Sequence, residues 1–144
     1  MSISASIDIV LQPKTKTLSD LFSVLLAAGW SESDHGQLTC MDTGDEFDWS
    51  EKNIDDLNLV LNRLTGILAK EQPIGIVLTW PKELIGGMFV ISPKERMLSV
   101  ICSIYRKTLD SSPRWTDYSW YLERLIVPLE KSGYQIESIT CQDY

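Results

Sequence analysis

Residues 74–80 read Ile74-Gly75-Ile76-Val77-Leu78-Thr79-Trp80, and this stretch decides the fold class. It is apolar at nearly every position, so both faces of a strand here would be apolar, as is typical of a central strand covered on both sides. Gly75 predicts that another group packs closely against the backbone. Residues 86–92 and 97–106 follow as two more strands. The short polar connection at 93–96 between them contains a proline suited to a turn, which predicts a β-hairpin.

The chain before this stretch alternates between strands and helices. Residues 3–11 alternate apolar and polar side chains, which predicts a strand with one buried face, and residues 21–28 form an apolar helix stopped by Gly29. Residues 36–42 resemble a weaker strand. Asn53 is a good helix N-cap, and leucines repeating every three or four residues from Leu57 to Leu68 predict a helix that runs to about Lys70.

The chain after this stretch adds one helix and one strand. The helix is expected to begin at Pro113 or Thr116, to run to Lys131 and to kink near Arg124, because Pro128 removes a backbone donor. Residues 134–141 are the last expected strand. The order predicts a single α+β domain over residues 1–144, with a mainly antiparallel sheet of about five to six strands and three helices packed on it.

Composition limits the classes of partner. The chain has 144 residues, a net charge of −7 and a pI near 4.6. It shows no cluster of Lys and Arg, so neither nucleic acid nor an anionic membrane surface is an expected ligand. The first residues lack the pattern of a signal peptide, which leads us to expect a soluble, cytoplasmic protein. Three scattered cysteines and one histidine, His35, argue against a disulfide framework, a zinc site and a recognisable catalytic pair.

Nine of the twenty acidic residues fall within residues 31–56, where the only base is Lys52. Asp55 and Asp56 stabilise the first turn of the following helix. The acids before that helix have no local structural task, and we expect them to face a partner together with Trp49, an aromatic anchor in a polar loop. The expected partner-binding residues are Asp42, Asp45, Glu46, Asp48, Trp49 and Glu51.

Two alternatives remain open for these acids. In the first, these acids only form a solvated surface. In the second, a loose magnesium site is formed by Asp42, Asp45 and Asp48, and the chain is a metal-assisted hydrolase. The loop does not match a calcium-binding loop, because Gly44 and Glu46 stand at the wrong positions. We therefore expect a binding protein without a cofactor rather than an enzyme.

The third helix carries a second candidate surface. Its stripe of Trp115, Tyr118, Leu122, Leu125, Ile126 and Leu129 is expected to face the core, which leaves Trp120, Tyr121 and Arg124 off that stripe. An exposed Trp and Tyr there would form a homodimer contact or a second part of a binding surface. The alternative is that a second layer of the protein covers them.

A small acidic α+β chain with aromatic residues in an acidic loop resembles the immunity proteins that bacteria pair with polymorphic or contact-dependent toxins. The resemblance is one of general character over the whole chain. It implies that the partner is a toxin with a basic surface, which the acidic, aromatic-containing loop would occlude.

Overall fold

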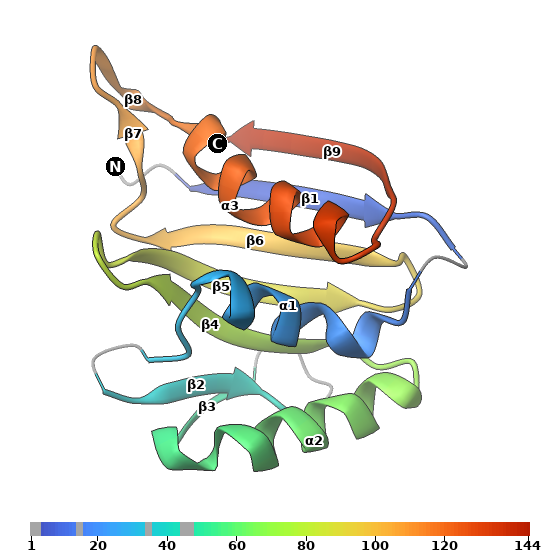
Figure 1. Cartoon of the computed structure of the whole chain (residues 1–144). Coiled ribbons are helices and arrows are strands. Elements are labelled where there is room, and N and C mark those ends of the chain that lie inside the picture. The colour runs from blue at the N-terminus through green and yellow to red at the C-terminus, as the bar shows by residue number, and fades with distance from the viewer. Residues whose placement is uncertain (1–3, 14–15, 34–35, 44–47) are drawn as a thin grey trace.

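The sheet and helices follow the chain order expected from the sequence, with additions. A computed structural model describes residues 4–13, 16–33, 36–43 and 48–144. The strands are β1 (Ala5–Leu11), β2 (Leu38–Met41), β3 (Trp49–Lys52), β4 (Ile74–Trp80), β5 (Ile85–Ser92), β6 (Met97–Ile104), β7 (Thr108–Leu109), β8 (Ser112–Thr116) and β9 (Ile136–Asp143). The helices are α1 (Leu21–Ala28), α2 (Leu57–Ala69) and α3 (Tyr118–Lys131), with short 3-10 turns at Leu18–Asp20 and Ile54–Asp56 (Figure 1).

Seven strands form one antiparallel sheet in the order β3-β2-β4-β5-β6-β1-β9, and β7 and β8 form a separate hairpin. The α+β class and the antiparallel sheet are confirmed, but the expected five to six strands are too few. The main sheet gains β3, which lies in a stretch expected to be a loop. Its sequence, Trp49-Ser50-Glu51-Lys52, lacks a run of apolar residues, and pairing with β2 rather than local preference makes it a strand.

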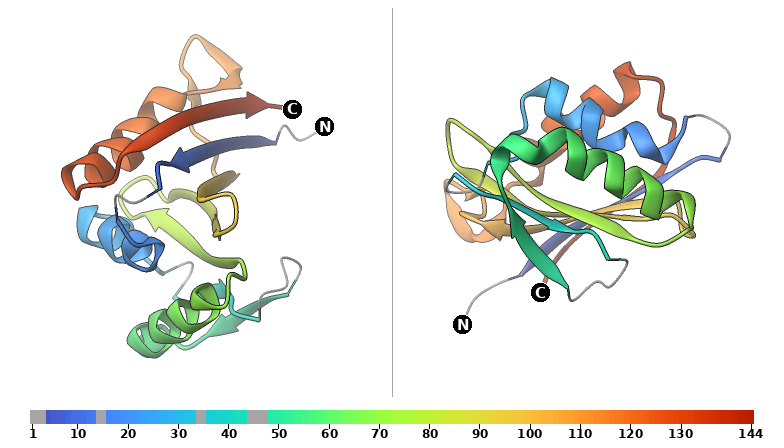
Figure 2. Two further views of the ribbon diagram at one scale, coloured as in Figure 1. Left: turned by 90° about the vertical axis from the view of Figure 1, so that its right-hand side faces the viewer. Right: turned by 90° about the horizontal axis from the view of Figure 1, so that it is seen from below.

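All three helices lie on the same face of the main sheet (Figure 2). They bury apolar side chains against it, including Leu25 of α1, Leu64 of α2 and Leu125 of α3. β4 is therefore covered by helices on one face only, not on both as expected. Its second face is buried without a helix: the Trp49 ring of β3 lies against Gly75, and Val77 on that face is nearly inaccessible. We call this second face of the sheet the open face, because no described helix lies over it.

Three local predictions are confirmed: one hairpin turn, one helix stop and one N-cap. β5 and β6 pair as a hairpin around residues 93–96, where Arg96 N donates to the Pro93 carbonyl at 3.2 Å. Gly29 ends α1 with a φ of 125°, a left-handed conformation that glycine adopts without a steric penalty. The side-chain oxygen of Asn53 accepts from Asp55 N at 3.0 Å and caps the turn that leads into α2.

The third helix begins later than expected. Residues 112–116 form β8, and α3 starts at Tyr118 after Asp117, whose side chain accepts from Trp120 N at 3.3 Å. Pro128 lies within α3 as expected. Its ring nitrogen has no hydrogen, so the Arg124 carbonyl, four residues earlier, loses its helical donor. The indole Nε1 of Trp30 donates to that carbonyl at 3.0 Å and replaces the missing bond.

None of the described helices is both long enough and apolar enough to cross a membrane.

Candidate functional site

The expected acidic surface is divided by the structure. Asp42 directly follows β2, and its side chain is only 4% exposed. Its carboxylate Oδ2 lies 3.4 Å from Arg63 Nε of α2 and 3.6 Å from Lys52 Nζ of β3. The prediction that Asp42 faces a partner is therefore wrong. A strand directs neighbouring side chains to opposite faces, so after Met41 points to the open face, Asp42 points toward α2.

Asp48 and Glu51 are exposed, at and near the start of β3. Asp45, Glu46 and His35 lie outside the described residues. The hypothesised magnesium site needs Asp42 together with Asp45 and Asp48, but the Asp42 carboxylate is already paired with two cations. Among the described residues, no group of three or more His, Cys, Asp or Glu gathers in a way that could hold a metal ion.

Trp49 is half-buried and lies against the open face of the sheet. It pairs with Met41, and Met41 pairs with Gly75 of β4, so all three occupy one row across the strands. A Cβ placed on Gly75 would be 2.6 Å from Trp49 Cη2. This contact confirms the close approach expected at Gly75, because a residue without a side chain leaves room for the indole ring. The ring extends from β3 across buried Met41 of β2 and contacts Gly75 of β4.

Beside Trp49 the open face forms a shallow apolar groove of about 580 Å³. Its other lining residues come from the outward side of β5 and β6 and are Met88, Val90, Ser92, Met97, Ser99 and Ile101. The register places Met88 opposite Ile101 and Val90 opposite Ser99, so the groove follows adjacent rows of the sheet. Each lining residue is half-buried, and the groove carries no charged side chain.

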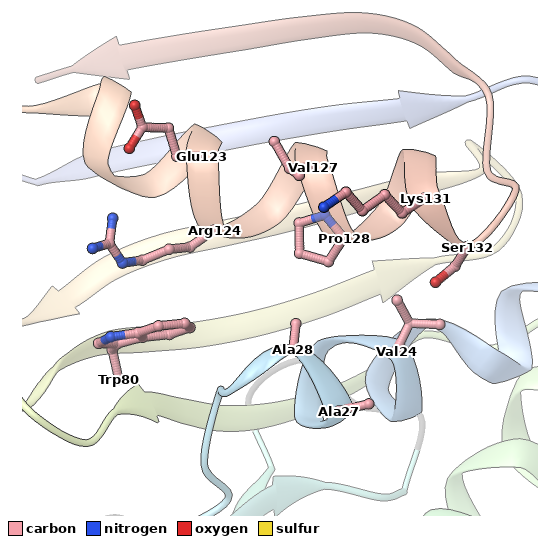
Figure 3. A pocket seen from close by; sticks show the side chains of 10 residues that line it. All are labelled: Val24, Ala27, Ala28, Trp80, Glu123, Arg124, Val127, Pro128, Lys131 and Ser132. Atoms are coloured by element: carbon pink, nitrogen blue, oxygen red, sulfur yellow. The ribbon is translucent and has the colours of Figure 1, made fainter.

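The helical side of the molecule carries a second groove, of about 410 Å³, between α1 and α3. Figure 3 shows Arg124 over the Trp80 ring at one end of it and Lys131 toward the other, with Val24 and Ala28 of α1 across from them. The Arg124 guanidinium carbon lies 5.1 Å from the centroid of the Trp80 ring and 4.2 Å from that of Trp120. Its Nη1 donates to the Trp120 carbonyl at 2.9 Å. Arg124 is thus bound to the protein itself, in cation–π contacts that stabilise the fold.

Trp120 and Tyr121 do not form an exposed patch, because they are 9% and 0% exposed. Trp30 lies edge-on to Trp120, with ring centroids 6.1 Å apart, and the Tyr121 hydroxyl accepts from Lys107 N at 3.0 Å. The exposure that a homodimer contact through these rings would need is therefore absent, and the alternative that another layer of the protein covers them is confirmed. Conversely Trp115, expected in the core stripe, lies in β8 and is 46% exposed.

Burial lowers the reactivity of two of the three thiols, those of Cys40 and Cys102. It raises the pKa of Cys102 to about 12, and burial together with the Asp42 charge raises the pKa of Cys40. The expectation that Cys102 is a buried small hydrophobe is confirmed.

Sequence reasoning missed the groove on the open face. The relevant signal was present, since Met88, Val90 and Met97 alternate with the buried side chains of β5 and β6. What was lacking was the information that all the helices cover the opposite face. No protein-family model matches this sequence, and neither a curated protein nor a solved structure is similar to it.

Proposed function

We propose that this chain binds another protein through the open face of its sheet, with Trp49 as the apolar anchor and Asp48 and Glu51 at the rim. The observation that carries the proposal is the apolar groove beside Trp49. Protein interfaces combine an apolar centre rich in Trp and Met with a polar rim. The groove supplies such a centre, and the two exposed carboxylates would pair with basic side chains of the partner.

In its specific form, the proposal is that the chain is an immunity protein and that its partner is a bacterial toxin. The acidic composition and the general resemblance to immunity proteins support this form. The proposal now depends less on charge than the sequence indicated, because Asp42 is neutralised within the fold. The partner surface would be an apolar patch bordered by Lys or Arg. Because the mechanism is occlusion of the toxin, the chain itself needs no catalytic residue and no cofactor.

The test is whether the chain binds the product of the gene adjacent to its own and protects bacteria in which that product is expressed. Trp49→Ala should weaken binding about thirtyfold, since truncating a central aromatic anchor costs about 2 kcal/mol or more. The double variant Asp48→Lys, Glu51→Lys should slow association and abolish protection at low expression.

Glu130→Lys is the control for charge reversal away from the groove: it changes the net charge by two units, as each of the two substitutions does, at an exposed position of α3 on the helical face. It should leave binding and protection unchanged, and the charge variants should retain the melting temperature of the unaltered protein. Trp49→Ala uncovers Met41 and Gly75, so it should melt at a lower temperature, and its binding is compared where circular dichroism shows that it is folded. The proposed surface is wrong if Glu130→Lys abolishes binding while folded Trp49→Ala binds normally. The immunity form is wrong if the unaltered chain neither binds the adjacent gene product nor protects cells from it.

A further inference from the structure

The two edges of the main sheet differ in how well they are protected from pairing with another strand. β3, at one edge, has four residues and carries Glu51 and Lys52. β9, at the other edge, has eight residues, Ile136-Glu137-Ser138-Ile139-Thr140-Cys141-Gln142-Asp143, and contains no Lys, Arg or Pro. Long edge strands without these features are prone to pair with another chain. Among the described strands, β9 pairs only with β1, and Figure 1 shows it at the outer edge beside that strand.

The register identifies the backbone groups of β9 that point outward. Tyr144 N donates to the Ser4 carbonyl at 2.9 Å, and two residues further along each strand Ser6 pairs with Gln142. In an antiparallel ladder, alternate residues exchange hydrogen bonds with the neighbouring strand. Thr140 and Gln142 therefore bond to β1, while the N–H and C=O groups of the residues between and beside them point away from it. Those residues are Ile139, Cys141 and Asp143.

The side chains at this edge favour contact with another apolar surface. Ile139 is 40% exposed although it lies on the helical face of the sheet, opposite buried Ile9. Ile136 and Cys141 on the same face are half-buried. Leu122 of α3 is also half-buried, and it lies one helical turn after Tyr118, whose hydroxyl donates to the Asp143 carboxylate of β9. An apolar strip therefore borders the outward-pointing backbone.

We propose that a second copy of this chain pairs with β9 in antiparallel fashion, with the two-fold axis at Cys141, so that the two sheets become one. Residues that face each other across such an edge must both be outward-pointing, which restricts the possible registers. An axis at Thr140 would oppose Glu137 to Asp143, a pair of like charges. An axis at Ile139 would use Glu137, where the register between β1 and β9 shifts and the ladder is irregular.

The axis at Cys141 uses all three outward-pointing residues of the regular part of β9. Cys141 then faces its own copy, Ile139 faces Asp143, and Thr140 faces Gln142. No like charges are opposed, which is what makes a second copy of this chain a suitable partner. Because each copy carries a net charge of −7, self-association should strengthen as salt screens the repulsion between copies.

The test measures the mass of the full chain in solution as a function of concentration and salt, together with cross-linking by diamide, an oxidant that takes two hydrogens from a pair of thiols. Facing residues of a hydrogen-bonded antiparallel pair have Cα atoms about 5.5 Å apart, within the range of a disulfide. We expect a dimer that diamide links through Cys141. Cys141→Ser should abolish the link and preserve the dimer. Cys40 and Cys102 are buried and serve as internal controls.

Cys141→Lys places two lysines opposite each other and should weaken the dimer about tenfold. Because Cys141 is half-buried against the core, an unchanged circular dichroism spectrum is the check that this variant is folded. Thr140→Lys is the matched control on the same strand, because in this register it faces Gln142 and should leave the dimer intact. A chain that is monomeric at all concentrations and salt levels overturns the proposal. So does a dimer that is neither linked through Cys141 nor weakened by Cys141→Lys. These outcomes are independent of partner binding at the groove beside Trp49, whose test uses other variants.

Discussion

The hydrogen bond between Trp30 and α3 gives a prediction that follows directly from Pro128. Proline deprives the Arg124 carbonyl of its helical donor, and the Trp30 indole N–H, 3.0 Å away, takes the place of that donor. Trp30→Phe keeps an aromatic ring but removes the N–H. Pro128→Ala restores the backbone N–H within α3. The two substitutions therefore act on the same carbonyl oxygen, and their effects on stability should not add.

The size of the coupling follows from the carbonyl group. Trp30→Phe leaves this oxygen without a donor, which costs about 1–3 kcal/mol, and it also alters the edge contacts of Trp30 with Trp80 and Phe89. In the Pro128→Ala background the helix supplies the donor, so only the loss of ring contacts remains. The double-mutant cycle should give a coupling of about 1–2 kcal/mol, with Trp30→Phe less costly when residue 128 is alanine.

Urea unfolding followed by circular dichroism measures the four free energies, provided that the slope with denaturant is the same for all four proteins. A coupling below about 0.5 kcal/mol would mean that the two substitutions act independently, and it would refute the role assigned to the Trp30 indole. Val127→Ala is a matched control beside Pro128, because this side chain is exposed and its truncation leaves the backbone donors of α3 unchanged. It should show no coupling with Trp30→Phe.

Three further predictions concern the sheet and its buried hydroxyl and thiol groups. Gly75→Ala should destabilise the fold by about 1–3 kcal/mol in urea unfolding, because the added Cβ meets the Trp49 ring, and it should cost less in a Trp49→Ala background. Burial raises the pKa of Tyr134 to about 12, above its value in the unfolded chain, and its hydroxyl donates to the Thr17 carbonyl. This contribution to stability is complete below about pH 10 and is lost as the pH rises toward 12, so Tyr134→Phe should flatten the alkaline fall of the unfolding free energy. With an aromatic disulfide reagent at neutral pH, Cys141 should react first and the two buried cysteines only on unfolding; equal rates for all three would contradict their burial.

The elements that could be predicted from the sequence are those whose apolar pattern is long. β4, β5 and β6 have seven or eight residues each, and the leucine repeat of α2 extends over several turns. The spacing of apolar residues in these segments shows whether one face or both faces are buried, and this spacing can be recognised within the segment itself. β3, β7 and β8 have two to five residues and no such pattern. Each forms because the strand next to it in the chain supplies its hydrogen-bonding partner, β2 for β3 and β7 and β8 for each other, and the apolar pattern of one short segment does not reveal that pairing.

The predicted core stripe of α3 was correct in part: Leu125 and Leu129 are buried, but Trp115 is exposed, and Trp120 and Tyr121 are buried as well. Starting the helix at Pro113 or Thr116 placed Trp115 in the core stripe, whereas the Asp117 cap starts it at Tyr118. Aromatic residues occur on more than one side of this helix, so the helical period alone did not show which side is buried. Trp30, from the loop after α1, and Trp80, at the end of β4, decide which side is buried by packing against Trp120.

The acidic segment shows why charge density along a chain is a weak guide to charge on a surface. In a strand, successive side chains point to opposite faces, so acids that are close in sequence separate in space. The Asp42 side chain points toward α2 and pairs there with Arg63, which lies more than twenty residues further along the chain. Asp48 and Glu51 remain exposed beside Trp49. A partner at this edge would therefore meet fewer charges and more apolar surface than the sequence indicates. For this reason truncation of Trp49 should affect equilibrium affinity more than reversal of either carboxylate, while the carboxylates should mainly affect the association rate.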